Sequence, residues 1–339
     1  MRIESPRRPT IIDVAARAGV SKSMVSLVLR GANVVSEEKK RLVMQAAAEL
    51  GYRPNAVARS LARRKTNLFG IVLSDLHNPF FTEVIDGIEA EAETQGYRTI
   101  ISTASRFATA ERRALDTLLE LRADALILAS PMLEIDDITA ASLEVPVVLV
   151  ARPSSVDTVD SVTNDDAGGT RLVVQHLTEL GHRRIAHIDG GGGAGAAERR
   201  ASFARVMEEH GLSEHVRVVP GGYTEDGGRA GVAALLESGE RPTAIFVAND
   251  LAAVGALSAL AERGIRVPQD MSVVGYDNTA LAALRHIDLT TVDQPRPVMG
   301  RTAVTLMLER LRGKRTEGRH ITIPPQLVVR ATTAPPRTT

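Results

Sequence analysis

The sequence predicts a small all-α helix-turn-helix head followed by an α/β core of two lobes with parallel sheets. Close to the N-terminus, two apolar-periodic runs of about eight residues are joined by a glycine turn. From Leu68 onward, apolar runs of strand length alternate with helical runs, which is typical of parallel sheets covered on both faces. The length of 339 residues fits two or three domains and a large buried core.

The charge distribution separates the head from the core. The net charge is zero, yet residues 1–66 contain 14 Lys and Arg against 5 Asp and Glu, whereas the rest contains 27 against 36. A basic head on an acidic body is typical of a nucleic-acid-binding module attached to another domain. A solvated basic tail is the alternative on charge alone, and the helix pattern of the head argues against it.

Composition limits the compartment and the cofactors. The chain has no Cys, which excludes disulfides and thiolate metal sites and suits a reducing compartment. The N-terminus lacks the apolar run of a signal peptide, and no stretch is apolar enough to span a membrane. We therefore expect a cytoplasmic protein, associated with the nucleoid if it binds DNA, with no membrane partner and no cofactor.

Capping residues place the first two head helices. Thr10 is a good N-cap for a helix over 11–18, which Gly19 would end. Ser21 caps a second helix over 22–29. In such a layout the start of the second helix contacts base edges in the major groove. The side chains expected there are Lys22, Ser23, Ser26 and Leu27.

A third helix follows, and a fourth short one after it. Ser36 is the expected N-cap of the third helix, which ends at Leu50-Gly51. Its apolar residues, which would cover the first two helices, are Leu42, Val43, Ala46, Ala47 and Leu50. Asn55 can cap a helix over 56–62 that is too short to be stable alone. There Leu61 lies beside Arg59, as an apolar wedge in a minor groove would, although the segment by itself favours an ordinary linker helix.

Two runs in the sequence resemble the LacI/GalR (lactose-repressor) family of bacterial regulators. They read IIDVAARAGVSKSMVSLVLRG and GYRPNAVARSLARRKTNLFGIVLSDLHNPFF, and the resemblance extends over nearly the whole chain. It implies that residues 10–53 bind an operator half-site and that residues 54–64 form a hinge helix that orders on DNA. It also implies a homodimer on a palindromic operator. The implied DNA-binding residues are Ser21, Lys22, Ser23, Ser26, Leu27, Ser36, Asn55, Ala58, Arg59 and Leu61.

The core pattern predicts two lobes. The alternating runs occupy about 260 residues, and short crossings near 162–166 and 292–295 would form the hinge between lobes. The family's core is of the periplasmic-binding-protein type. We expect a DNA-binding domain over 1–53, a hinge helix and linker over 54–66, and an effector-binding and dimerisation core over 67–330. Within the core, the first lobe would comprise about 67–163 and 296–330, the second about 164–295, and a disordered tail would follow over 331–339.

Polar residues follow the ends of the predicted strands, where ligands bind in open parallel sheets. A sugar-like ligand needs bidentate polar groups and an aromatic face. By similarity to the family, the effector-binding residues would be Asp75, Phe80, Phe81, Arg199, Tyr223, Asn249, Asp277 and Gln294. Strand-end capping is the alternative for any one of them. The chain departs from the family at Ala151, often Asp, and at Ser202, often Gly, so its sugar specificity does not simply carry over.

Other patterns are weaker. Residues 190–195 satisfy G-x-G-x-x-G, which would bind a dinucleotide, but no acidic residue follows at convincing spacing. No metalloprotease or nucleophile-elbow motif is present, and His182 reads as a turn residue. The alternation of Glu and Arg over 111–113 predicts a solvated helix face that includes Glu111. We therefore expect no enzyme but a repressor of carbohydrate-related genes under a small-molecule, sugar-like effector. A solute-binding protein without a DNA role and a nicotinamide-dependent enzyme are the alternatives.

Overall fold

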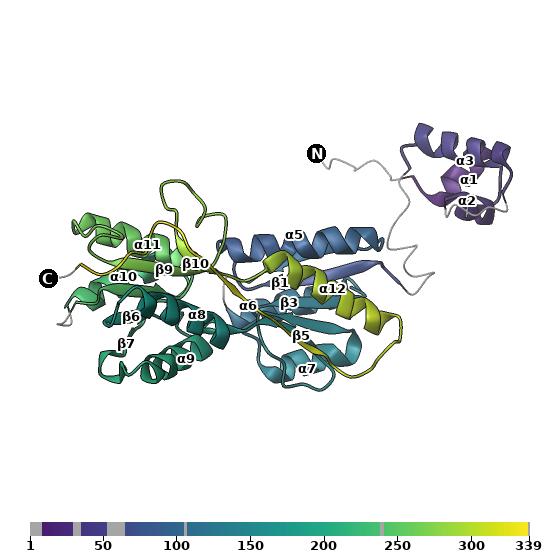
Figure 1. Cartoon of the computed structure of the whole chain (residues 1–339). Helices are drawn as coiled ribbons and strands as arrows, with labels where there is room; N and C mark the ends of the chain where they lie inside the picture. The colour runs from purple at the N-terminus through teal and green to yellow at the C-terminus, as the bar shows by residue number, and fades with distance from the viewer. Residues whose placement is uncertain (1–8, 30–34, 53–64, 105–106, 238–240, 338–339) are drawn as a thin grey trace, which may run out of the picture. The chain divides into compact units, whose positions relative to one another are not determined.

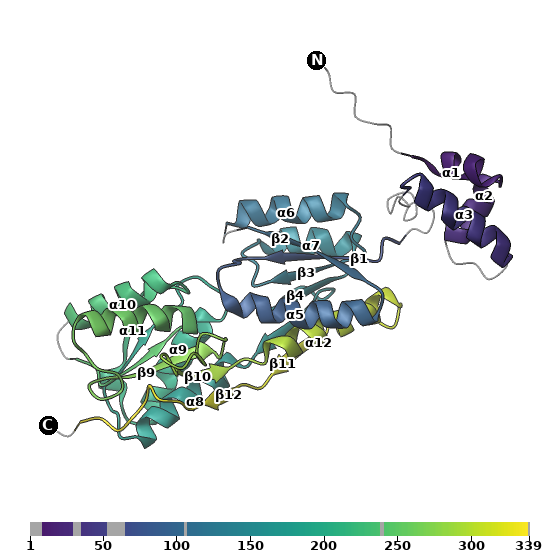
Figure 2. The ribbon, with the colours of Figure 1, turned by 90° about the horizontal axis from the view of Figure 1, so that it is seen from above.

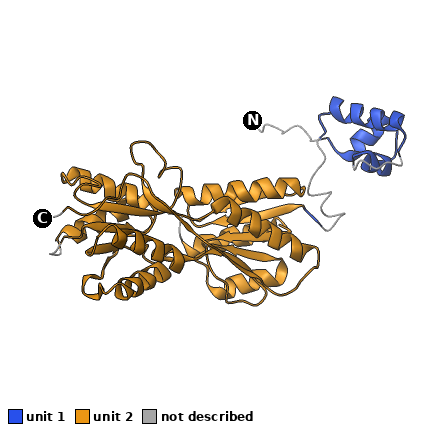
Figure 3. Ribbon diagram, in the orientation of Figure 1, with its two compact units in different colours: residues 1–66 blue, residues 67–339 orange. Residues whose placement is uncertain are grey.

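The computed structural model describes residues 9–29, 35–52, 65–104, 107–237 and 241–337. They fall into two compact units, residues 1–66 and residues 67–339, which Figure 3 colours separately. The first is all-helical and the second is α/β. This confirms the fold class that the sequence predicts.

Local capping sets the bounds of the first two head helices. Helix α1 (Ile11–Ala18) begins with a capping box, in which the Thr10 N–H donates to Asp13 Oδ2 at 2.7 Å and the Asp13 N–H donates to Thr10 Oγ1 at 3.4 Å. Gly19 ends α1 at a φ of 65°, in the left-handed region. Ser21 Oγ accepts from the Met24 N–H at 3.2 Å at the start of α2 (Lys22–Leu29). These bounds agree with the predicted ones.

Helix α3 (Glu37–Glu49) closes the core of the head. Its Val43, Ala46 and Ala47 are buried in one cluster with Val14 of α1 and Val25 of α2. Burying a side chain of this size contributes about 1.5–3 kcal/mol, so the few buried valines are a main source of the head's stability.

Two expectations for α3 need correction. Leu42 is 37% exposed, because it lies one position away from the buried stripe that Val43 and Ala46 define. Ser36 occupies the N-cap position in an extended conformation, but its side chain makes no capping hydrogen bond. A separate contact, an ion pair of 2.6 Å between Arg17 and Glu49, joins α1 to α3.

In the part of the second unit that the structure describes there are two six-stranded sheets, one in each lobe. The first lobe's sheet has the order β11-β5-β4-β3-β1-β2, and all its pairs are parallel. Its strands are β1 (Leu68–Leu73), β2 (Arg98–Thr103), β3 (Ala125–Ala129), β4 (Val147–Val150), β5 (Asp160–Asn164) and β11 (His320–Ile323).

The second lobe's sheet has the order β12-β10-β9-β8-β6-β7 and is parallel except for the pair β10–β12. Its strands are β6 (Ile185–Ile188), β7 (Arg217–Val219), β8 (Ala244–Val247), β9 (Ser272–Asp277), β10 (Thr290–Asp293) and β12 (Gln326–Val328). The central strands of both sheets are continuous apolar runs because both of their faces are buried.

Helices cover both faces of each sheet, as Figures 1 and 2 show. The first lobe carries α5 (Pro79–Thr94) and α12 (Arg296–Leu311) on one face, and α6 (Ala108–Glu120) and α7 (Ile135–Glu144) on the other. The second lobe carries α8 (Asp166–Glu179) and α9 (Ala196–Glu209) opposite α10 (Glu225–Glu237) and α11 (Asp250–Glu262). A short 3-10 turn, η1 (Ser213–His215), follows α9.

Helices α5 and α12 pack unusually closely, because each has a glycine at the contact. A Cβ added to Gly87 would lie 2.2 Å from the Pro297 carbonyl oxygen, and one added to Gly300 would lie 2.2 Å from that of Val84. The two helix backbones therefore meet directly, with no side chain between them.

Within the described residues, three chain crossings join the lobes. Two of them, after β5 and after β10, are the ones that the sequence predicts. The third lies at Pro324-Pro325, between β11 of the first lobe and β12 of the second. The predicted extension of the first lobe to residue 330 is therefore wrong, because β12 pairs with β10.

The predicted disorder of residues 331–339 is also wrong for the part that the structure describes, 331–337. Thr332 is 4% exposed, and its Oγ1 donates to the Val273 carbonyl at 2.7 Å. The Ala334 carbonyl accepts a hydrogen bond from Ser272 Oγ at 3.1 Å. This segment follows the sheet of the second lobe because β12 directs it there.

No helix in the described part of the chain is both long and apolar enough to cross a membrane. Within the same residues, no group of three or more His, Cys, Asp and Glu side chains could hold a metal ion.

Candidate effector cleft and DNA-binding head

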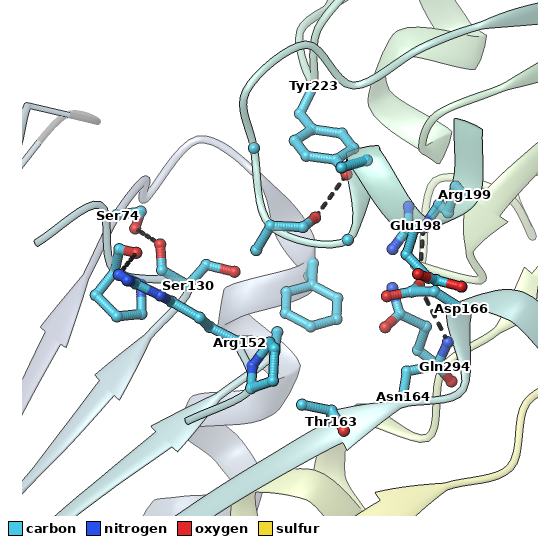
Figure 4. A pocket seen from close by; sticks show the side chains of 18 of the residues that line it. Ser74, Ser130, Arg152, Thr163, Asn164, Asp166, Glu198, Arg199, Tyr223 and Gln294 are labelled. Atoms are coloured by element: carbon cyan, nitrogen blue, oxygen red, sulfur yellow. Dashed lines mark hydrogen bonds and ion pairs between the residues drawn. The ribbon is translucent and has the colours of Figure 1, made fainter. Parts of the chain in front are cut away.

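A cleft of about 800 Å³ lies between the two lobes. Its walls come from the carboxyl ends of the strands and the helices that follow them, as expected for parallel sheets. In Figure 4, Ser74, Ser130 and Arg152 stand on one side, and Asp166, Arg199 and Gln294 on the other. The first three belong to the first lobe and the others to the second.

The structure brings together most of the predicted effector-binding residues. Those that line the cleft are Asp75, Phe80, Phe81, Arg199, Tyr223, Asp277 and Gln294. Asn249 does not line it, although it follows β8 as predicted. Its Oδ1 accepts from the Ala252 N–H at 2.9 Å and so caps α11, the strand-end role that was the alternative.

Arg199 is the central cation of the second lobe's wall. It lies in the first turn of α9, not in the turn before that helix, and is 5% exposed. Its Nε donates to Asp166 Oδ1 at 2.8 Å, and its Nη1 donates to the Ala248 carbonyl at 2.6 Å. The guanidinium carbon lies 3.7 Å from the centroid of the Tyr276 ring. These contacts fix the guanidinium plane beside the cleft.

Asp277 lies on the same wall as Arg199, since both belong to the second lobe, so the two do not face each other across the cleft. It is 3% exposed, and Gln294 Nε2 donates to its Oδ1 at 2.6 Å. Burial raises the pKa of Asp277 to about 7, Arg199 opposes the rise, and the nearby Asp250 carboxylate adds to it. Asp277 and Asn278 both have positive φ, 106° and 54°, a strain that the surrounding contacts maintain.

The glycine-rich loop after β6 folds around Tyr223 and forms the mouth of the cleft. A Cβ on Gly190 or Gly193 would lie 2.4 or 2.3 Å from atoms of the Tyr223 ring. The Tyr223 hydroxyl donates to the Ala194 carbonyl at 2.7 Å. Glycines at these two positions leave room for an aromatic ring of the same chain, which explains them without a dinucleotide.

The first lobe's wall combines apolar and polar groups. Asn78 caps α5 by accepting from the Phe80 N–H at 3.0 Å, and Phe80 and Phe81 meet edge to face with ring centroids 5.2 Å apart. Asp75 opens the loop before them, and its Oδ1 accepts from the His77 N–H at 2.8 Å. Ala151 lines the cleft, so this wall has no carboxylate at that place.

Sequence reasoning missed a buried carboxylate behind this wall. Glu111 of α6 is fully buried, and the prediction of a solvated face is wrong for it. Its Oε1 accepts from Ser74 Oγ at 3.0 Å, and its Oε2 accepts from the N–H groups of Met132 and Leu133 at 2.6 and 3.1 Å. Burial raises the pKa of Glu111, and these three hydrogen bonds oppose the rise. Local sequence gives no sign of this role, because the partners come from distant strands.

Further lining residues were also missed. Arg152 Nη1 donates to the carbonyls of Pro131 and Leu133 at 2.8 and 2.7 Å, which holds the loop after β3 against the cleft. Asn164 Nδ2 donates to the Tyr276 hydroxyl at 2.7 Å, and that hydroxyl donates to Asp166 Oδ1 at 3.2 Å. Because β5 is short and polar, the sequence does not indicate that Asn164 ends a strand.

In the head, the predicted DNA-binding residues lie at the start of α2. Ser21, Lys22 and Ser23 are exposed, whereas Ser26 and Leu27 are half-buried. Ser36 is exposed before α3. The predicted hinge-helix residues Asn55, Ala58, Arg59 and Leu61 lie outside the described residues.

Comparisons with known proteins agree with this architecture. Residues 10–55 match the family described as bacterial regulatory proteins, lacI family, and residues 174–333 match the periplasmic binding protein-like domain. The regulator DegA of Bacillus subtilis (strain 168) is 34% identical, with 97% of this chain and 99% of DegA covered. The repressor PurR of Vibrio cholerae serotype O1 (strain M66-2) is 35% identical, with 95% and 97% covered.

Among solved structures, a lac repressor dimer bound to operator and the anti-inducer ONPF superimposes with a TM-score of 0.86 at 32% identity. The match covers 97% of this chain and all of that one. DegA and PurR are described as a transcriptional regulator and a transcriptional repressor. With an exposed helix-turn-helix surface in its head and an effector cleft in its core, this chain belongs to the LacI family of DNA-binding transcriptional regulators.

Proposed function

We propose that the protein is a repressor of carbohydrate-related genes that binds a palindromic operator as a homodimer and is released by a sugar-like effector. The observation that carries the proposal is the combination, in one chain, of an exposed helix-turn-helix surface and a polar cleft between two lobes. Its target would be chromosomal DNA, so we expect the protein in the cytoplasm, at the nucleoid.

The chemistry of the cleft supports a polyhydroxylated ligand. Arg199, Asp277 and Gln294 offer fixed donors and acceptors on one wall, and Phe80 and Tyr223 offer flat apolar surface. Sugars are bound by this mixture, because their hydroxyls need paired polar groups and their C–H faces pack on aromatic rings. The volume of about 800 Å³ lies within the range of sites for small ligands.

Repression and release would both depend on the relative orientation of the two lobes. A ligand held by both walls favours one relation between the lobes, and the head is joined to the first lobe ahead of β1. If that relation differs from the one that suits the operator, ligand and DNA oppose each other by the same coupling free energy, typically about 1–3 kcal/mol. We propose this sign, induction.

Removal of the head tests the DNA part of the proposal. Residues 1–66 form a separate compact unit, so a chain starting at residue 67 should keep its core. We expect this truncated protein to lose operator binding and to keep effector binding. Operator affinity equal to that of the full chain would refute the role of the head.

A thermal-shift screen of sugars and nucleosides tests the effector part. Each compound that raises the unfolding temperature is then added to a complex of the full chain with operator, selected from random DNA. We expect a sugar or sugar derivative among the hits and weaker operator binding in its presence. Hits confined to nucleosides, or a hit that tightens operator binding, would contradict the proposed effector class or sign.

A further inference from the structure

The second crossing between the lobes carries a charged side chain that contacts both of them. Arg296 begins α12 directly after β10, and its side chain is 6% exposed. Its Nε and Nη2 donate to Glu83 Oε2 at 3.1 and 2.9 Å. Glu83 lies on α5, one turn after the Phe80 and Phe81 that line the cleft. This is the first lobe's side of the contact.

The other contacts of Arg296 are to the second lobe. Its Nη2 also donates to the Asn278 carbonyl at 2.7 Å, and its Nη1 donates to Asp293 Oδ1 at 3.2 Å and to the Gln294 carbonyl at 2.9 Å. All three nitrogens of the guanidinium are therefore engaged. A planar guanidinium with this many partners holds its orientation far better than an ammonium would.

These partners are continuous with the effector cleft. Asn278 follows Asp277, and both have the left-handed backbone described above. Gln294 holds Asp277 through its side chain and Arg296 through its carbonyl. A shift of Asp277 on binding a ligand would therefore displace the groups to which Arg296 is bonded.

The first-lobe end of this chain of contacts is rigid. Helix α5 meets α12 through the glycines Gly87 and Gly300, with backbone against backbone. Glu83 lies one turn from Gly87 on the same helix. Since Arg296 is itself the first residue of α12, its contact with Glu83 stays within the paired helices of the first lobe, and its contact with the Asn278 carbonyl reaches the second lobe.

We propose that Arg296 is a positioning residue that fixes the relative orientation of the two lobes. It does so by bonding both to the cleft end of β9 and to α5. Arg296 does not line the cleft. Its guanidinium instead determines which lobe relation the ligand-free protein adopts. That this relation governs the response to an effector rests on the function proposed above, whereas the fastening itself does not.

The test measures the lobe relation directly. The chain contains no cysteine, so Leu143→Cys on α7 and Ser213→Cys beside α9, both at exposed positions of different lobes, can carry a pair of spin labels. Pulsed electron–electron double resonance on the full chain then gives the distribution of distances between the lobes. We expect one narrow distribution in the otherwise unchanged protein.

The variants are Arg296→Met, Arg296→Lys and Glu83→Gln, with Arg315→Met as the matched control. Arg315 is 13% exposed and pairs with Asp160 and Glu309, all within the first lobe. We expect Arg296→Met to shift or broaden the distribution, and Arg296→Lys to restore it only in part. Glu83→Gln should broaden it less than Arg296→Met, because the amide oxygen still accepts. Arg315→Met should lower the unfolding temperature and keep the original distances.

The proposal is overturned if Arg296→Met and Glu83→Gln keep the original distribution, or if Arg315→Met changes it as much as they do. If Arg296→Met does not fold, Glu83→Gln decides, since the Glu83 side chain is 28% exposed and glutamine keeps its size. Failure to find an operator or an effector would contradict the proposed function and leave these distances unaffected.

Discussion

At the scale of single residues, Arg199 is the group on which effector binding should depend most. Its guanidinium is held by Asp166 and the Ala248 carbonyl, so it meets a ligand without reorganising. A hydrogen bond to a charged group contributes about 1.5–3 kcal/mol. We therefore expect Arg199→Ala to weaken binding of the identified effector by roughly 10- to 150-fold, measured by titration calorimetry.

The matched control for that measurement is Arg171→Ala. Arg171 pairs with Glu209 on the surface of the second lobe and does not line the cleft. Its removal should leave the affinity for the effector unchanged. Equal affinity of the unchanged protein and Arg199→Ala would place the site elsewhere.

Asp277 and Asp250 are two buried carboxyl groups of the second lobe that interact electrostatically. Asp250 accepts from the Thr279 N–H, the Thr279 hydroxyl and the Thr291 hydroxyl, whereas Asp277 accepts only from Gln294 among the side-chain contacts described. Burial raises the pKa of both carboxyls, to about 6 for Asp250 and about 7 for Asp277. The hydrogen bonds favour ionised Asp250, so Asp277 is the carboxyl that stays protonated to the higher pH.

This proton has a consequence for stability. Since the folded pKa of Asp277 lies above that of an unfolded Asp, near 4, the folded state binds more protons between these values. The free energy of unfolding should therefore fall as the pH rises from about 4 to about 7. We expect Asp277→Asn to remove that part of the dependence, measured by urea denaturation at a series of pH values. A difference between the two proteins that stays constant with pH would contradict the assignment.

At the scale of elements, the start of α2 should set the operator sequence. Lys22 is exposed at the first position of that helix, where side chains reach base edges. We expect Lys22→Ala to change the preferred base at one symmetric position of a selected binding site, at a cost of about 1–3 kcal/mol. Lys39→Ala, on exposed α3, should leave the selected sequence as it is. An unchanged motif for Lys22→Ala would argue against this role.

The contact between α5 and α12 gives a second element-scale prediction. Alanine favours a helix over glycine by about 1 kcal/mol, but the Cβ of Gly300→Ala would lie 2.2 Å from the Val84 carbonyl oxygen. Overpacking of this kind costs about 1–3 kcal/mol. We expect a net loss of stability in urea denaturation, whereas Gly192→Ala, where a Cβ meets nothing within 4 Å, should cost little. Equal stabilities would show that the helices can separate freely.

The elements that could be predicted from sequence are those with a strong local signal. Capping residues gave the bounds of α1 and α2, and apolar runs gave the central strands. The local signal is weaker for α10, which holds three glycines, and for β11 and β12, which are short and partly exposed. In the cleft, Asp277 follows from its place at a strand end and Arg199 from the resemblance to the family, but Glu111 depends on contacts over long sequence separations.

At the scale of the whole molecule, the symmetry of the operator sets the number of chains. A palindromic site and a pair of heads require two-fold symmetry. We expect sedimentation velocity to show a homodimer on operator DNA, with the core supplying the contact, because the head is small. A truncated chain lacking residues 1–66 should keep the dimer, and a stable monomer on DNA at micromolar concentration would contradict the expectation.

The return of the chain to the second lobe at Pro324-Pro325 bears on how this protein could be recombined with its relatives. An exchange of the second lobe between two regulators, cut only near residues 164 and 295, would leave β12 from one parent to pair with β10 from the other. The segment behind it, in which Thr332 and Ala334 bond to β9, would be mismatched as well. A functional chimaera with a new specificity therefore needs a third junction, at the two prolines. A fusion partner at the C-terminus would be attached to the second lobe, not to the first lobe that follows the head.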